Sequence, residues 1–335
     1  MLDKLERPMR DLRISVTDRC NLRCRYCMPR EVFGPDHHFL PREQLLSFEE
    51  IARVATVMAE QGIDRVRLTG GEPLLRRGLE RLVELIARIP GVEDLSLTTN
   101  GLLLERRAQA LADAGLNRVT VSLDALDADV ARRVADAALD PGRVLAGIEA
   151  AAAAGLSPVK VNMVVRRGLN DGEVLAMAER FRGAGTVLRF IEYMDVGTTN
   201  GWLLEDVVPA AEILELIGSR WPLEPLAPTR HGEVASRYRY GDGGGEIGVI
   251  HAVTAPFCHG CTRARLSADG RLFTCLFAAE GHDLRALMRA GADDEELARA
   301  VGAVWSRRTD RYSAQRAAAS AGDQTARVEM SYIGG

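Results

Sequence analysis

The sequence is almost without lysine, poor in aromatic residues and free of long hydrophobic runs. Aromatic residues make up 5% of the 335 residues, and only Lys4 and Lys160 among the 43 basic residues are lysines, so 41 are arginines. No apolar segment reaches the ~18 residues that a membrane-spanning helix needs. The charged start has no apolar stretch of the kind found in signal peptides. We therefore expect a soluble, cytoplasmic protein without membrane contacts.

The composition excludes several further classes of protein. Hydrophobic residues account for 47% and charged residues for 27%, unlike a disordered chain, a collagen or a small disulfide-rich domain. The net charge of −4 lacks the basic excess of proteins that coat nucleic acids, so we expect no nucleic-acid partner. At roughly 150 residues per domain, the length fits one large domain or two smaller ones.

Short β-rich segments alternate with amphipathic, helix-forming segments over the first two thirds of the chain. The six predicted strands cover residues 12–17, 65–70, 94–100, 118–124, 158–165 and 186–194. A helix over 47–61 has Ser47 as its N-cap, with Glu50 three residues later. The glycines expected to end helices are Gly62, Gly91, Gly115, Gly155 and Gly185. Serial βα units favour a parallel sheet, and six of them predict an incomplete (βα)6 barrel.

Within these strands, apolar and polar residues alternate. If the apolar face packs against the helices, the polar face lines the barrel interior. The polar positions are Arg13, Ser15, Thr17, Arg67, Thr69, Ser96, Thr98, Thr120, Ser122, Asp124, Lys160 and Asn162. Together with Arg189, the basic residues predict a cationic channel for a large polar ligand. An antiparallel sheet with one solvated face is the alternative that this alternation leaves open.

The βα pattern stops in the proline-rich segment 223–233. We therefore predict a partial barrel over residues 1–225 and a smaller domain over 226–335. The second part is expected to hold antiparallel strands, one helix and a polar, alanine-rich tail that ends in Gly334 and Gly335. Its predicted elements are strands 235–240 and 245–253, a hairpin of 262–267 and 271–277 that turns at 268–270, and a helix at about 283–308.

All six cysteines fall into two triplets. Cys20, Cys24 and Cys27 follow the first strand, and Cys258, Cys261 and Cys275 lie in the C-terminal hairpin region. Thiolates at such spacing bind a metal ion or an iron–sulfur cluster. Structural zinc needs a fourth ligand, for which His37, His38 and His259 are candidates, and this alternative stays open for the second triplet. Three cysteines on a four-iron cluster instead leave one iron free for a substrate or cofactor.

The first triplet, in the sequence CNLRCRYC at 20–27, resembles the CxxxCxxC signature of radical S-adenosylmethionine (SAM) enzymes. The GGEP sequence at 70–73 resembles a second motif of that family. Over its full length the chain is similar to the branch that converts GTP to (8S)-3',8-cyclo-7,8-dihydroguanosine 5'-triphosphate, the first step of molybdenum cofactor biosynthesis. The similarity extends to CHGCTRARLSADGRLFTCLF at 258–277 and to the terminal Gly-Gly.

The resemblance implies a role for each motif residue. Each cysteine triplet would hold a [4Fe–4S] cluster, and the free iron of the second cluster would bind the guanine of GTP. The implied SAM contacts are Tyr26, Gly71, Ser122 and Met194. The implied GTP contacts are Arg13, Arg67, Thr98, Lys160, Arg263 and Arg265. The residues implied in the later steps of the reaction are Arg189, Gly334 and Gly335.

Two observations from the residues themselves support an anionic substrate. Arg263 and Arg265 alternate on one face of the strand beside Cys261, and paired guanidinium groups suit phosphate oxygens. Lys160 occupies an interior-facing position in a chain that otherwise uses arginine, which predicts a specific role for its ammonium group.

The resemblance also implies partners: a one-electron reductant such as flavodoxin or ferredoxin, a downstream cyclic pyranopterin monophosphate synthase, and a second copy of the chain in a homodimer. Two other functions compete with this one. A radical SAM peptide maturase would carry a longer C-terminal cysteine array than three residues. A zinc-ribbon protein that binds nucleic acid disagrees with the net charge and with the polar barrel interior.

Overall fold

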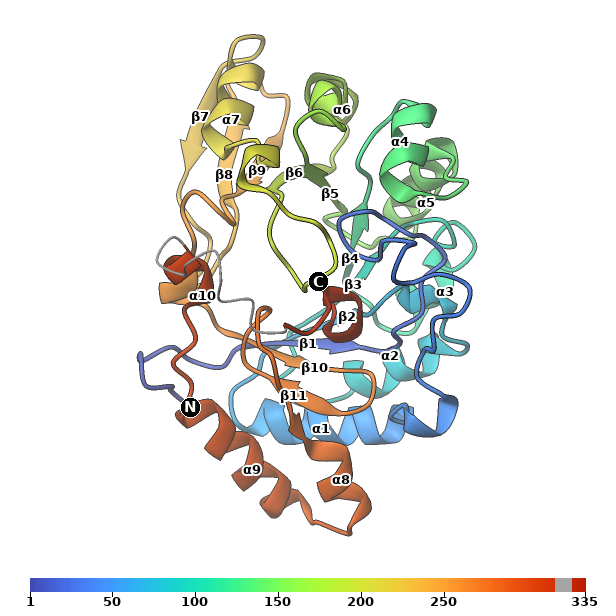
Figure 1. Ribbon diagram of the computed structural model, residues 1–335, viewed down its shortest axis with the longest axis vertical. Helices are drawn as coiled ribbons and strands as arrows, with labels where there is room; N and C mark the ends of the chain where they lie inside the picture. The colour runs from blue at the N-terminus through green and yellow to red at the C-terminus, as the bar shows by residue number, and fades with distance from the viewer. Residues whose placement is uncertain (317–326) are drawn as a thin grey trace.

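The computed structural model describes residues 1–316 and 327–335, and its strands form one mixed sheet (Figure 1). The strand order in this sheet is β12-β11-β10-β1-β2-β3-β4-β5-β6-β9-β8-β7. The strands are β1 Asp11–Ser15, β2 Arg65–Thr69, β3 Asp94–Thr99, β4 Arg118–Ser122, β5 Lys160–Val165, β6 Val187–Glu192, β7 Leu223–Leu226, β8 Ser236–Tyr240, β9 Glu246–Ile250, β10 Arg263–Leu266, β11 Arg271–Phe273 and β12 His282–Asp283.

The six predicted strands, β1 to β6, pair in chain order and all in parallel. This confirms the incomplete (βα)6 barrel, and the antiparallel alternative is wrong. The C-terminal region extends both edges, because β10 pairs in parallel with β1 and β9 pairs in parallel with β6. Within the described ranges, β9 and β10 do not pair with each other, so the curved sheet stays open.

Most helices cover the outer side of this curved sheet (Figure 1). These are α1 Phe48–Glu60, α2 Leu79–Ala87, α3 Ala108–Asp113, α4 Ala128–Ala135, α5 Pro141–Ala153, α6 Val174–Phe181, α7 Ala210–Gly218, α8 Leu284–Arg289 and α9 Asp294–Ser306. Two short helices follow, α10 Tyr312–Gln315 and α11 Met330–Ile333, and α11 lies on the inner side of the sheet, where it contacts β1. Ser47 and Glu50 form the predicted capping box at the start of α1. The apolar strand residues are fully buried, as with Leu12, Leu68 and Val121, because they pack against these helices.

The C-terminal region follows the predicted hairpins but not the predicted helix. Strands β8 and β9 are antiparallel, and so are β10 and β11. The single helix expected at 283–308 is wrong, because α8 and α9 are separate. Gly291 takes a φ of +95°, which ends the first helix, and Asp293 starts the second through a capping box with Glu296. Residues 317–326 of the alanine-rich tail lie outside the described residues.

Strands from both sides of the predicted domain boundary belong to the same sheet. β9 and β10 come from the C-terminal part of the chain, yet they flank β6 and β1 of the N-terminal part. The division at 225 and 226 remains a prediction. Among the described helices, none combines the length and the apolar character needed to cross a membrane.

Candidate active site

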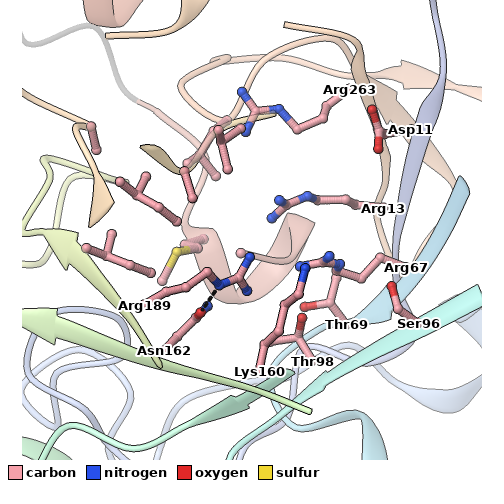
Figure 2. A pocket seen from close by; sticks show the side chains of 18 of the residues that line it. Asp11, Arg13, Arg67, Thr69, Ser96, Thr98, Lys160, Asn162, Arg189 and Arg263 are labelled. Atoms are coloured by element: carbon pink, nitrogen blue, oxygen red, sulfur yellow. Dashed lines mark hydrogen bonds between the residues drawn. The ribbon is translucent and has the colours of Figure 1, made fainter. Parts of the chain in front are cut away.

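The concave interior of the sheet holds a cavity of about 530 Å³, a size that suits a nucleotide. Most of the predicted polar strand positions line it, but Ser15, Thr17 and Thr120 do not, because they are buried outside the cavity. Figure 2 shows the side chains of Arg13, Arg67, Lys160, Arg189 and Arg263 pointing into one space from different strands. All six cysteines line this same cavity, and so do all predicted SAM and GTP contacts: Tyr26, Gly71, Ser122, Met194, Arg13, Arg67, Thr98, Lys160, Arg263 and Arg265.

The two cysteine triplets lie at opposite ends of the cavity. Cys20 follows the carboxyl end of β1, whereas Cys261 precedes β10, whose Arg263 pairs with Asp11 at the amino end of β1. The ends of β1 are four residue steps apart, or about 13 Å at ~3.3 Å per residue. A bound group at one triplet therefore faces a bound group at the other across the cationic interior.

Close packing of two loops places Gly71 beside the first triplet. The backbone N–H of Gly71 donates to Thr17 O at 2.7 Å, and that of Glu72 donates to Arg19 O at 2.8 Å. A Cβ atom at Gly71 would lie 2.3 Å from Arg19 O. Only glycine permits this approach, so the motif at 70–73 brings the end of β2 against the cysteine loop.

Two carboxylates support this end of the cavity, and the sequence did not indicate their roles. Glu72 accepts hydrogen bonds from Thr99 Oγ1 and from the Asn100 N–H, both at 2.7 Å, and so joins the loops after β2 and β3. Asp124 accepts a hydrogen bond from Tyr26 OH at 2.8 Å. Burial raises the pKa of both carboxyl groups to about 6. The loops around the first triplet are therefore fixed by buried hydrogen bonds.

Burial favours the neutral form of the thiols in the first triplet, so a bound metal group would have to supply the positive charge that stabilises their thiolates. Burial raises the pKa of Cys20 to about 11, and it also raises the pKa of Cys24 and Cys27. Within the described ranges, no three Cys, His, Asp or Glu side chains lie close enough to hold a single metal ion. The six thiols line the cavity as two sets of three, and thiolates are the ligands that hold iron–sulfur clusters.

The second triplet has a more cationic environment. The Arg263 guanidinium donates to Cys261 Sγ at 3.2 Å, and Arg308 donates to the same sulfur at 3.1 Å. Burial alone would raise the pKa of Cys261, but these two charges outweigh it and lower the pKa to about 6. The candidate histidine ligands His37, His38 and His259 do not line the cavity.

Seven cations that line the cavity lack a carboxylate partner within the described part of the chain. They are Arg13, Arg67, Lys160, Arg189, Arg230, Arg263 and Arg265, whereas Arg65 and Arg118 pair with Asp11 and Asp94. Arg189 instead donates to Asn162 Oδ1 at 2.9 Å (Figure 2). Such a group of uncompensated charges favours a ligand that carries several negative charges.

The same crowding lowers the pKa of several of these groups. Burial, followed by repulsion from other arginines, lowers the pKa of Arg67 to about 10 and those of Arg189 and Arg265 to about 9. Burial and the charge of Arg189 lower the pKa of Lys160 to about 7. Binding of an anion would relieve this repulsion.

The C-terminal tail enters the cavity. Gly335 lines it, and the carbonyl oxygen of Gly334 accepts a hydrogen bond from Arg265. Gly334 has a φ of +77°, and a Cβ atom there would lie 2.2 Å from Thr69 Cγ2. In Figure 1 the C-terminus lies on the inner side of the curved sheet. The two terminal glycines thus occupy a space that leaves no room for a side chain at Gly334.

Sequence reasoning missed a polar rim at the amino ends of the strands. It consists of Asp11, Arg65, Asp94 and Arg118, which line the cavity as two ion pairs. Each of these residues lies two positions before the first predicted interior residue of its strand, and therefore on the same face. The alternation of polar and apolar residues thus already indicated them. Arg308 was also missed, and no local pattern marks it.

Comparisons with known proteins identify the family. Residues 14–181 match the model of the radical SAM superfamily, and residues 186–314 match that of "Molybdenum Cofactor Synthesis C". The chain is 55% identical to a GTP 3',8-cyclase of Acidothermus cellulolyticus and 48% identical to one of Staphylococcus aureus. In both cases 99% of this chain and 98% of the relative are covered.

A solved structure supports the fold. Streptococcus suis SuiB bound to S-adenosylmethionine superposes with a TM-score of 0.61 at 14% identity, over 91% of this chain and 69% of that one. The cysteines and basic side chains surround one cavity, and the sequence is about half identical to these relatives over its full length. The chain therefore belongs to the radical SAM superfamily and, within it, to the GTP 3',8-cyclase family.

Proposed function

We propose that this protein cyclises GTP to (8S)-3',8-cyclo-7,8-dihydroguanosine 5'-triphosphate, using SAM and two [4Fe–4S] clusters. The observation that carries the proposal is the group of unpaired cations that shares one cavity with the two cysteine triplets. When bound, SAM and its cluster supply a 5'-deoxyadenosyl radical that removes the hydrogen from ribose C3', so that C3' bonds to guanine C8. One electron and one proton complete the product.

The residues of the chain divide into three groups around this reaction. Cys20, Cys24 and Cys27 would hold the first cluster, with Tyr26, Gly71, Ser122 and Met194 around SAM. Cys258, Cys261 and Cys275 would hold the second cluster, which would bind the guanine. Arg13, Arg67, Lys160, Arg263 and Arg265 would bind the triphosphate. The buried Thr98 Oγ1 has no hydrogen-bond partner among the described residues, which leaves it available to GTP.

Two further groups are assigned to the later stage. Arg189 is oriented by Asn162 and would assist the final electron and proton transfer. The Gly334–Gly335 tail reaches the same cavity and would help to close it around the substrate. Closing the cavity excludes water, which protects a radical from side reactions.

The test is anaerobic turnover with reductant, SAM and GTP deuterated at C3'. The expected result is 5'-deoxyadenosine that carries deuterium, formed together with a cyclised nucleotide. Consumption of SAM without transfer of deuterium would contradict the proposal. A parallel incubation with a peptide library tests the maturase function, which predicts modification of a peptide and no reaction of GTP.

The affinity for GTP is expected to fall as the pH rises above about 7. Lys160 is charged below its pKa of about 7 and neutral above it, so binding of GTP at higher pH must take up a proton. The phosphates are fully ionised above pH 7.5. The dissociation constant should therefore increase by about tenfold between pH 7.5 and 8.5, as measured by calorimetry.

Because the chain has only two lysines, the charge of Lys160 can be followed by nuclear magnetic resonance. Protein labelled with 13C at lysine Cε should give two signals, one from Lys160 and one from the exposed Lys4, which serves as reference. The Lys160 signal should titrate near pH 7 and move to higher pH with GTP. The Lys160→Arg variant should show a flatter pH dependence of affinity. A wild-type affinity that is equally flat would contradict the role of Lys160.

We further propose three partners for the reaction. A one-electron donor such as flavodoxin or ferredoxin would reduce the clusters, and a cyclic pyranopterin monophosphate synthase would take up the product. A homodimer is the expected assembly. Sedimentation of the holoenzyme tests the assembly, and reduction assays with each purified donor test the first partner.

A further inference from the structure

Four residues from the two ends of the chain meet beside the second cysteine triplet. Asp3 and Arg7 come from the N-terminal segment, and Arg308 and Asp310 follow α9. Figure 1 shows the N-terminus beside the end of α9. The Arg7 Nε donates to Asp3 Oδ2 at 2.7 Å, and Arg308 Nη1 lies 3.4 Å from the same oxygen. We call these four residues the terminal clamp.

The terminal clamp contacts residues at or next to each cysteine of the second triplet. Arg7 Nη1 donates to the carbonyl oxygen of Cys258 at 2.8 Å. Arg308 donates to the carbonyl oxygen of Cys261 at 2.7 Å and to its Sγ at 3.1 Å. Asp310 accepts a hydrogen bond at 2.6 Å from Thr274, which precedes Cys275. The clamp therefore holds the backbone at Cys258 and Cys261 and the side chain next to Cys275, and Arg308 also contacts the Cys261 sulfur.

Burial makes these charges effective. The side chains of Asp3, Arg7 and Arg308 are at most 1% exposed, so water screens them little. Trp305 adds support, since its indole N–H donates to Arg7 O at 3.2 Å and the Arg308 guanidinium lies 4.5 Å from its ring centre. Burying ion pairs in such an environment costs free energy. An effect of these charges on the properties of the adjacent cluster would explain why they are buried at this position.

We propose that the terminal clamp sets the reduction potential of the second cluster, with Arg308 as the positioning residue that acts on the Cys261 sulfur. This inference rests on the second cluster of the proposed function. Hydrogen bonds to the sulfurs and nearby charge determine the potential of an iron–sulfur cluster. Reduction adds one negative charge, so a buried guanidinium favours the reduced form and a buried carboxylate disfavours it.

The test is a redox titration of the full-length holoenzyme without GTP, followed by electron paramagnetic resonance. Arg308→Met is expected to shift the midpoint potential of the second cluster to more negative values. Asp3→Asn is expected to shift it to more positive values. The first cluster serves as an internal reference and should not move. Arg307→Met, which removes an exposed arginine next in the chain, is the matched control and should leave both potentials unchanged.

Shifts of the midpoint potential in opposite directions distinguish this electrostatic role from a purely structural one. If the substitutions only loosened the loop, the direction of the shift would not depend on whether a positive or a negative charge was removed. Shifts in the same direction, or no shift with iron retained, would overturn the inference. If the Arg308→Met variant loses iron from the second site, the Arg308→Lys variant should retain this iron and have a midpoint potential below that of the wild type. Loss of iron from the Arg307→Met control as well would overturn the inference. A wild type with only about four irons would instead contradict the proposed second cluster.

Discussion

Replacing Cys24 by serine is expected to abolish both SAM cleavage and formation of the cyclic nucleotide. A hydroxyl group is a poor ligand for iron compared with a thiolate, so the first cluster would be lost. Cys24 lies at the end of the cavity where the segment around Gly71 packs against the cysteine loop, which also contains Tyr26. The iron content should fall from about eight to about four per chain, and 5'-deoxyadenosine should be undetectable in an anaerobic assay.

Cys261→Ser is the matched variant at the opposite end of the cavity. It should also reduce the iron content by half, but it should leave SAM cleavage measurable and abolish cyclisation, because the substrate end alone is damaged. Equal loss of SAM cleavage in the two variants would contradict the separate roles of the triplets. A wild type with about four irons and one zinc would restore the zinc alternative for the second triplet.

Replacing Arg265 by methionine is expected to weaken GTP binding by roughly 10- to 150-fold. This factor corresponds to the about 1.5–3 kcal/mol of a charge-assisted hydrogen bond. Arg265 is 3% exposed and lies between Arg13 on β1 and the hairpin strand β11. Its partner in the absence of substrate is the carbonyl oxygen of Gly334, so its charge is available to a phosphate. The dissociation constant of GTP is the quantity to measure.

Arg271 is the matched control for this substitution. It lies in the same hairpin but outside the cavity, where it contacts the carboxylates of Asp269 and Asp283. Arg271→Met should therefore leave GTP affinity unchanged. SAM binding should persist in both variants. Similar losses of GTP affinity in the two would show that the hairpin as a whole, and not the charge at Arg265, supports binding.

Local patterns in the sequence determined the main architecture and the chemistry. Alternation with a period of two placed Arg13, Arg67 and Lys160 on the inner face, because a strand directs successive side chains to opposite sides. The helix cap formed by Ser47 and Glu50 involves residues only three positions apart, so the local sequence predicted it as well. The cysteine spacing predicted two metal-binding segments, and the structure places both triplets on one cavity.

Only the tertiary structure decided which distant segments meet. β9 and β10 join β6 and β1, which turns a six-stranded arc into eight parallel strands around one cavity. The same folding brings Asp3 and Arg7 against Arg308, and Arg265 against Gly334. These contacts depend on how the strands pair and on which side chains are buried together. Both are determined jointly by residues that are far apart in the chain. The sequence by itself determined the parts of the site, and long-range packing decided how they face one another.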